Sequence, residues 1–211
     1  MALLGADFFA AKEVEKHIAA LVKMNMEFSA RIEGCRPPSS EHQSQNEEIV
    51  GRINAFRGRP LFYPYVGTGL GRGPYVELSD GSVKLDLING IGIHILGHSH
   101  PKVVAASLRG ALSDIVVQGN LQPNNEYLHL GEKLARLAGR QSRLKHSWIT
   151  TSGSMANENA LKLARQKNTP ARKIIAMKGA FAGRTTIMAE ITDNPAFREG
   201  LSEYNEVLRI P

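Results

Sequence analysis

Segments with helical and strand-like patterns of apolar residues alternate through the second half of the chain, and this alternation most limits the folds open to it. Short apolar runs of the kind that forms strands lie at residues 146–150, 173–177 and 185–191. Stretches with helical spacing lie around them, at 101–112, 124–137, 154–166 and 195–201. Each helix can return the chain to the same edge of a sheet, so the alternation predicts an α/β fold with a mostly parallel sheet.

The first 58 residues predict a polar helical arm. Apolar residues such as Ile18 and Val22 recur at helical spacing. A Pro-Pro pair at 37–38 interrupts the pattern, and Ser40 is placed to cap a second helix that reaches about residue 56. We expect such an arm to wrap over a core or a partner.

Residues 59–100 predict a hairpin and loops. Apolar and polar residues alternate over 75–78 and 83–87, and the turn dipeptide Asp80-Gly81 lies between these strands. The preceding run at 67–73, GTGLGRG, resembles a dinucleotide-binding loop only superficially, because it leads into a strand and not into a helix. A flexible loop is expected there.

Charge and composition exclude several classes of protein. The net charge is +6, but Lys and Arg are interleaved with Asp and Glu and no run of five like charges occurs, so nucleic-acid binding is not expected. No apolar run approaches the ~20 residues of a membrane span. The single cysteine, Cys35, cannot form an internal disulfide, which suits a reducing compartment. We expect a soluble, cytoplasmic protein.

The junction at 148–157, WITTSGSMAN, is the best candidate site. A strand leads into Ser152, Gly153 and Ser154, and a helix begins there. Ligands bind at the carboxyl ends of strands in α/β sheets, and the free N–H groups and dipole of a helix start attract anions. The junction is therefore either a phosphate cup or an N-capped helix without a ligand, since serine is a favoured cap.

A second candidate is the run at 178–185, KGAFAGRT, which follows a strand. Phe181 lies between two glycines and could stack on a flat ligand, and Arg184 could hold a carboxylate through two hydrogen bonds. The local pattern alone favours a plainer interpretation, which is a glycine-rich turn with a core phenylalanine and a surface arginine.

Three histidines crowd before Pro101. His94, His98 and His100 lie among glycines, in a pattern typical of irregular chain, and no carboxylate or thiol beside them in sequence completes a tetrahedral metal site. Hydrogen bonding within the turn is the expected role. No Gly-x-Ser-x-Gly elbow of a serine hydrolase is present.

Taken together, these motifs resemble the class III aminotransferases of the ornithine and acetylornithine type, which use pyridoxal phosphate (PLP). The resemblance covers about residues 60–195. It implies a fold-type I PLP enzyme, normally a homodimer, with a cytoplasmic location. The matching segments are YVELSDG (75–81), DLINGIG (86–92), LGHSHP (96–101), TSGSMANENALKLAR (151–165) and FAGRT (181–185).

The resemblance also implies roles for individual positions. Ser152, Gly153 and Ser154 match the phosphate cup, Phe181 the residue stacked on the cofactor ring, and Arg184 a substrate-carboxylate binder. Ile91 with its neighbours to residue 93, and Tyr63 within 62–65, match walls of the substrate pocket. Two departures put the substrate in doubt: Met155 where relatives usually carry Glu, and Ala182 where His or Trp is common.

The resemblance further implies three regions: a helical arm (1–58), a hairpin segment of the N-terminal domain (59–100) and the first part of the PLP-binding domain (101–211). Family members are about twice as long, so the Schiff-base lysine is expected beyond Pro211 and no catalytic residue within this chain. No metal is implied.

The expected function is the N-terminal portion of an aminotransferase that moves an amino group from an amino acid or ω-amino compound to a 2-oxo acid. Two alternatives stay open. The chain could be a catalytically incomplete partner in assembly, for instance of a complementing C-terminal chain, or part of a PLP aminomutase or decarboxylase. The donor is open among ornithine, acetylornithine, lysine and 4-aminobutyrate compounds.

Overall fold

The computed structural model describes residues 3–114 and 121–211. The chain divides into two compact units, residues 1–114 and 115–211, and each is described by itself. Within the described residues, no helix is long and apolar enough to cross a membrane.

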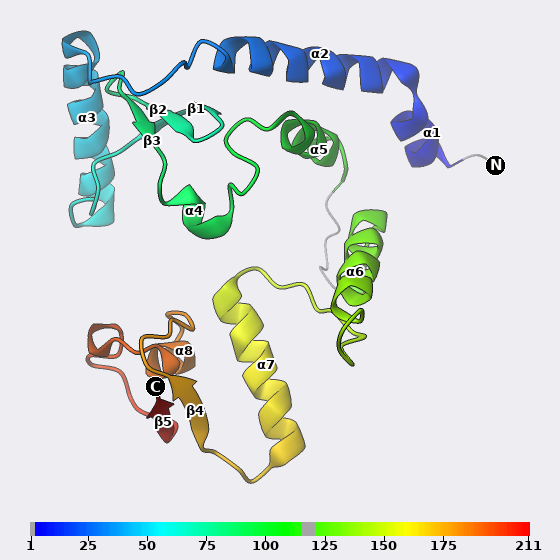
Figure 1. Cartoon of the computed structure of the whole chain (residues 1–211), viewed down its shortest axis with the longest axis vertical. Coiled ribbons are helices and arrows are strands. Elements are labelled where there is room, and N and C mark those ends of the chain that lie inside the picture. Colours follow the sequence, from blue (N-terminus) through cyan, green and yellow to red (C-terminus); the bar gives the residue numbers. More distant parts are fainter. Residues whose placement is uncertain (1–2, 115–120) are drawn as a thin grey trace. The chain divides into compact units, whose positions relative to one another are not determined.

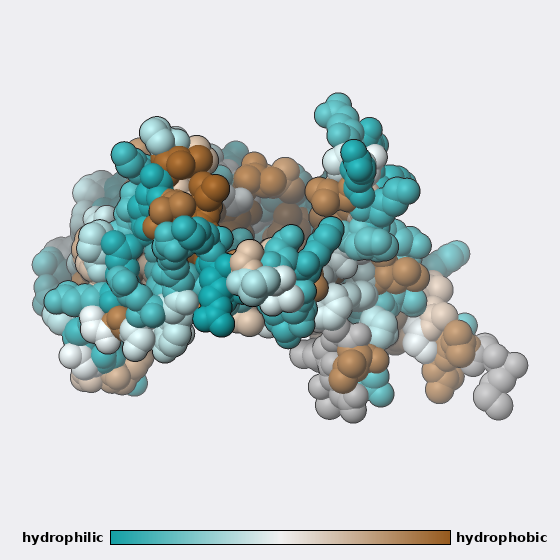
Figure 2. All heavy atoms as spheres, turned by 90° about the horizontal axis from the view of Figure 1, so that it is seen from below, coloured by the Kyte–Doolittle hydropathy of each residue, from teal (hydrophilic) through white to brown (hydrophobic). Residues whose placement is uncertain are grey.

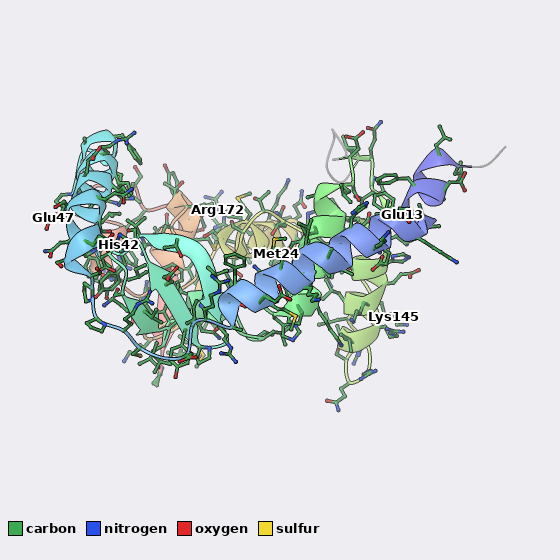
Figure 3. All side chains as sticks on the ribbon, turned by 90° about the horizontal axis from the view of Figure 1, so that it is seen from above. Glu13, Met24, His42, Glu47, Lys145 and Arg172 are labelled. Atoms are coloured by element: carbon green, nitrogen blue, oxygen red, sulfur yellow. The ribbon has the colours of Figure 1, made fainter. Side chains whose placement is uncertain are left out.

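Helices make up most of the first unit (Figure 1). Helix α1 covers Leu4–Ala10, α2 Lys12–Ser29, α3 Ser40–Arg57 and α5 Pro101–Ala111. Helix α2 packs along α5, and Arg109 of α5 pairs with Glu15 of α2. The helices expected within residues 1–58 are present. In α2, Ile18 is buried, and Met24, which Figure 3 labels, is exposed.

The cap of α3 differs from the prediction by one residue. Ser39, not Ser40, is the N-cap, and its side chain accepts a hydrogen bond from the Glu41 amide. The start of this helix lies against the hairpin turn, where an added Cβ at Gly81 would meet Ser39 and His42 at 3.1 and 3.0 Å. Figure 3 labels His42 on α3.

A three-stranded antiparallel sheet completes the first unit. Strand β1 covers Gly67–Arg72, β2 Tyr75–Leu78 and β3 Val83–Leu85, in the order β1-β2-β3. The predicted hairpin of β2 and β3 is confirmed, with Gly81 at φ 78° in its turn.

The predicted flexible loop at 67–73 is wrong, because most of it forms strand β1. Its glycines permit close packing: an added Cβ at Gly71 would lie 2.7 Å from both His98 Cβ and the Tyr75 carbonyl oxygen. Apolar alternation, the usual signal of a strand, is absent where glycine is required for space.

An aspartate and a histidine join the end of this sheet to the next segment. Asp86 Oδ2 lies 2.8 Å from His98 Nε2, and each side chain is only 16% exposed. Asp86 Oδ1 also accepts hydrogen bonds from the amides of Ile88 and Asn89. Hydrogen bonding from His98, then from the Asn89 amide, lowers the pKa of Asp86 below its ordinary value of 3.8.

The amide of His98 donates a hydrogen bond to the Gly73 carbonyl, and the amide of Gly73 donates one to the His98 carbonyl. The centroids of the His94 and His98 rings are 4.3 Å apart. Hydrogen bonding of the histidine turn is therefore confirmed. The sequence does not predict the partnership with Asp86, because Asp86 lies 12 residues before His98 and only the fold brings the two side chains together.

The second unit contains helices α6 (Asn125–Ala138), α7 (Gly153–Asn168) and α8 (Thr186–Ile191) and strands β4 (Ile174–Met177) and β5 (Val207–Ile210). Strands β4 and β5 pair in parallel, as predicted for an α/β fold (Figure 1). The buried residues of this unit include the apolar Ala176, Met188 and Ala189 and the polar Glu190 and Thr192.

Three expected elements of this unit are wrong. The run 185–191 is helical, residues 146–150 form no strand, and of 195–201 only Pro195–Phe197 forms a short 3-10 helix. A strand was expected at 185–191 because the run is short and apolar, and a run of that length does not distinguish the period of a strand from that of a helix.

Exposed apolar side chains are common in the described residues, and some appear as brown areas in Figure 2. In the second unit they include one whole face of the small sheet. Ile175 and Met177 of β4 pair with Leu208 and Ile210 of β5, and all four side chains are exposed.

The contact at Gly71 generates a stability prediction. Gly71→Ala places a methyl group 2.7 Å from His98 Cβ and from a carbonyl oxygen, and such overpacking costs about 1–3 kcal/mol of unfolding free energy. Urea unfolding followed by circular dichroism measures it. The control is Gly51→Ala in α3, where nothing lies within 4 Å and alanine is the better helix former. Equal stability of the two variants would contradict the packing argument.

The Asp86–His98 pair generates a pH prediction. The pKa of Asp86 is lower in the folded chain than in the unfolded chain, so its stabilisation is complete above the unfolded value of 3.8 and is lost as the pH falls through the lower folded value. The urea midpoint of the wild type should fall across this acid range, and that of Asp86→Asn should fall less. Asp7→Asn, at an exposed position on α1, should follow the wild type. Parallel curves for all three would refute the assignment.

Candidate functional site

Helix α7 begins with the capping arrangement that the sequence predicts. Ser152 has an extended backbone (φ −163°, ψ 164°), and its Oγ accepts a hydrogen bond of 3.2 Å from the Met155 amide. The Ser152 carbonyl accepts from the Ala156 amide. Because Ser152 satisfies the third amide of the helix, the first two amides remain for another partner.

Those first two amides belong to Gly153 and Ser154. Within the described part of the chain, neither donates a hydrogen bond, and nothing lies within 4 Å of the place where Gly153 would carry a Cβ. Two free N–H groups and the positive end of the helix dipole thus lie at a helix start that is open at Gly153, and the Ser154 hydroxyl lies beside them. This donor set fits a phosphate group.

The loop that carries Phe181 lies against this helix start. A Cβ added to Gly183 would come within 2.2 Å of Ser154 Oγ, so only glycine permits the approach. Asn157 of α7 donates a 2.7 Å hydrogen bond to the Ala182 carbonyl. The structure thus brings together two motifs that the sequence placed 25 residues apart.

Phe181 is not the core residue that the plainer interpretation required. Its side chain is 63% exposed, and it meets the ring of Phe197 edge to face at 6.0 Å between centroids. A mostly exposed ring on a loop that contacts the start of α7 can stack on a flat ligand.

Arg184 lies beside the same aromatic pair. Its guanidinium carbon is 4.5 Å from the centroid of Phe197 and 5.9 Å from that of Phe181. Among the described residues it forms no ion pair, so its donors remain available to an anionic ligand.

An acidic residue that the sequence did not single out holds the start of the Phe181 loop. Asp193 accepts a 2.8 Å hydrogen bond from the Gly179 amide and one of 2.7 Å from Arg209 Nε of β5. The Gly179 hydrogen bond, with help from Arg209, lowers the pKa of Asp193. No sequence signal marked this residue, because its partners come from two separate segments, one 14 residues before it and the other 16 residues after it.

The two expected pocket-wall residues, Tyr63 and Ile91, belong to the first unit, whereas Ser154 and Phe181 belong to the second. Tyr63 is 55% exposed and stacks on Tyr65 at 5.9 Å between centroids. Ile91 is 91% exposed and has φ 57° within α4 (Asn89–Gly92), two residues after Asn89, whose amide bonds to Asp86. Left-handed backbone is unfavourable for a β-branched residue and concentrates at functional sites.

Comparison with known proteins agrees with the sequence motifs. Residues 64–209 match the family model of class III aminotransferases. Over 129 residues, the chain is 39% identical to a putative LysW-aminoadipate semialdehyde/glutamate semialdehyde transaminase of Pyrococcus furiosus, covering 61% of this chain and 34% of the relative. It is 35% identical over 133 residues to the acetylornithine aminotransferase of Mycobacterium tuberculosis, covering 63% and 32%.

Solved structures show the same fold. The ornithine aminotransferase of Toxoplasma gondii superposes with a TM-score of 0.67 at 21% identity, covering 78% of this chain and 40% of that one. An omega-transaminase of Thermomicrobium roseum gives 0.66 at 24%, covering 78% and 39%. The predicted α/β fold of the PLP transaminases is thereby confirmed.

The alignments span about a third of the length of these curated relatives. The family match itself extends over more than half of the residues. The chain therefore belongs to the class III aminotransferase family.

Proposed function

We propose that this chain supplies the phosphate-binding and ring-binding part of a PLP-dependent aminotransferase, which moves an amino group from an amino acid or ω-amino compound to a 2-oxo acid. The observation that carries the proposal is the contact between Gly183 and the start of α7, because it sets an exposed aromatic ring beside two free helix amides. Membership in the family supports it.

The residues present fit the cofactor by their chemistry. A phosphate monoester carries up to two negative charges and accepts several hydrogen bonds, and the amides of Gly153 and Ser154 with two serine hydroxyls are donors at a positive helix end. The ring of PLP is flat and aromatic, and Phe181 offers an uncovered ring face. When bound, PLP supplies an electron sink for the bonds of the substrate amine carbon.

Every role that we assign to this chain is one of binding and orientation. Gly153 and Ser154 hold the phosphate, Phe181 limits rotation of the ring, and Arg184 turns a substrate carboxylate toward it. Orientation of this kind lowers the barrier because the reacting groups are held in place before reaction. Tyr63 and Ile91 of the first unit are proposed to line the substrate pocket.

The partners we propose are an amino donor and a 2-oxo acid, with a homodimer as the assembly. Exposed apolar residues of α2, among them Leu21 and Met24, offer surface for contacts between copies. A complementing chain is an alternative partner for the same surfaces.

The first prediction from this proposal concerns the phosphate. Ser154→Pro removes one free amide, and loss of a hydrogen bond to a charged group costs about 1.5–3 kcal/mol, which is a 10- to 100-fold weaker affinity. The probe is pyridoxine 5′-phosphate, whose fluorescence reports binding and which has no aldehyde to react with lysines. Ser154→Ala is the matched control, because it keeps the amide and should bind more tightly than the proline variant. Unchanged affinity in Ser154→Pro would remove the phosphate assignment.

The second prediction concerns the substrate. In a complete enzyme that combines this chain with the Schiff-base lysine, Arg184→Ala should raise the KM for an amino donor that carries a carboxylate by about 10-fold or more, since a charge-assisted pair is lost. Its affinity for pyridoxine 5′-phosphate should not change. An amine donor without a carboxylate serves as the internal control. If both donors and the probe lose affinity equally, Arg184 supports the fold and does not bind the substrate.

A further inference from the structure

The hydroxyl group of Thr192 is the centre of a buried hydrogen-bond cluster in the second unit. Thr192 directly follows α8 and is 1% exposed. Its Oγ1 accepts hydrogen bonds from the amides of Ala182 (2.9 Å) and Gly183 (3.2 Å), and it donates to the Gly183 carbonyl (2.9 Å). A hydroxyl has one donor and two acceptor positions, so this group is fully used.

The other end of the Phe181 loop is held by the next residue. The Asp193 carboxylate accepts from the Gly179 amide, and the Asp193 amide donates 2.8 Å to the Ala180 carbonyl. Thr192 and Asp193 therefore fix the backbone on both sides of Phe181. The ring itself is mostly exposed and touches only Phe197 among the aromatic residues described, so its own packing cannot define its position.

We infer that Thr192 is a positioning residue for the cofactor site: its hydroxyl fixes the 182–183 backbone, and thereby holds Phe181 at the start of α7. This inference rests on the proposed function, since it requires that Phe181 stack on the cofactor ring. The physical reason lies in how often the loop adopts the conformation that can bind the cofactor. A loop that samples several conformations binds its ligand with an affinity reduced by the fraction of time it spends in the competent one.

The Thr192 cluster also fixes the contact between the Phe181 loop and helix α7. Gly183 is the residue that meets Ser154, and both its amide and its carbonyl bond to Thr192. Loss of the hydroxyl therefore frees Gly183, whose close approach to Ser154 is one of the contacts between the ring-binding loop and α7, beside the Asn157–Ala182 hydrogen bond. The ring of Phe181 and the free amides of α7 would then no longer keep a fixed position relative to each other.

The test compares Thr192→Val, which keeps the shape and removes the hydroxyl, with Thr192→Ser, which keeps the hydroxyl. Two quantities are measured on the 211-residue chain: the affinity for pyridoxine 5′-phosphate, and the hydrogen exchange of the loop amides at 179–183. We expect Thr192→Val to bind about 10-fold more weakly and to exchange faster in the loop. Thr192→Ser should restore both. The matched control is Thr186→Val, an exposed threonine on α8 that should behave as the wild type.

A double-mutant cycle separates positioning from general stability. If Thr192 acts through Phe181, then Thr192→Val should add little to the loss of affinity caused by Phe181→Ala. A full additional 10-fold loss in the Phe181→Ala background would overturn the inference. Wild-type affinity of Thr192→Val together with faster loop exchange would also overturn it, because the loop would then be free to move without consequence for binding.

Failure of the proposed function gives a different result. In that case the wild type itself does not bind the probe, or it binds with an affinity that Ser154→Pro leaves unchanged. If Thr192→Val does not fold, as judged by circular dichroism, Asn157→Ala takes its place. It removes only the exposed hydrogen bond to the Ala182 carbonyl. It should weaken probe binding severalfold by the same route, and unchanged binding would count against the inference.

Discussion

The approach of Gly183 to Ser154 is the contact on which the candidate site depends. With 2.2 Å between an imagined Cβ and Ser154 Oγ, any other residue at 183 would separate the loop from the helix start. Gly183 also has φ 142°, in the region that favours glycine. The free amides of α7 and the exposed ring of Phe181 each occur in many proteins, and only their juxtaposition indicates a ligand with both a phosphate and a flat ring.

The hydrogen bonds behind this contact run from strand β5 to the end of α8 and the residues that follow it. Arg209 of β5 donates to the Asp193 carboxylate and to the carbonyls of Glu190 and Thr192. Glu190, which is buried, accepts from the Tyr204 amide and from Asn205. Strand β5, the end of α8 and the Phe181 loop are therefore joined by partly buried, charge-assisted bonds, which are stronger than bonds between neutral groups.

The sequence predicted those features whose signals are local. The start of α7 follows from a serine cap before a helical pattern, and the hairpin follows from alternation around Asp80-Gly81. Features that depend on distant residues escaped. Strand β5 has an arginine at 209 that faces Asp193 and breaks the apolar pattern, and β1 uses glycine where a sheet normally shows β-branched residues. The Asp86–His98 pair and the Thr192 cluster join residues whose partners lie 9 to 12 positions away, beyond any helical or strand period.

The backbone of Ala182 is held in place by groups other than its own side chain. Its amide is held by Thr192 and its carbonyl by Asn157, so both hydrogen-bonding groups of the residue are fixed without any help from its side chain. Where the family commonly carries His or Trp, the smaller side chain therefore leaves Phe181 in place and alters only the space beside the ring. By the same reasoning Met155 leaves the cap intact, because Ser152 binds its amide and not its side chain. We therefore expect both departures to bear on which substrate fits, since neither removes a group proposed to hold the cofactor.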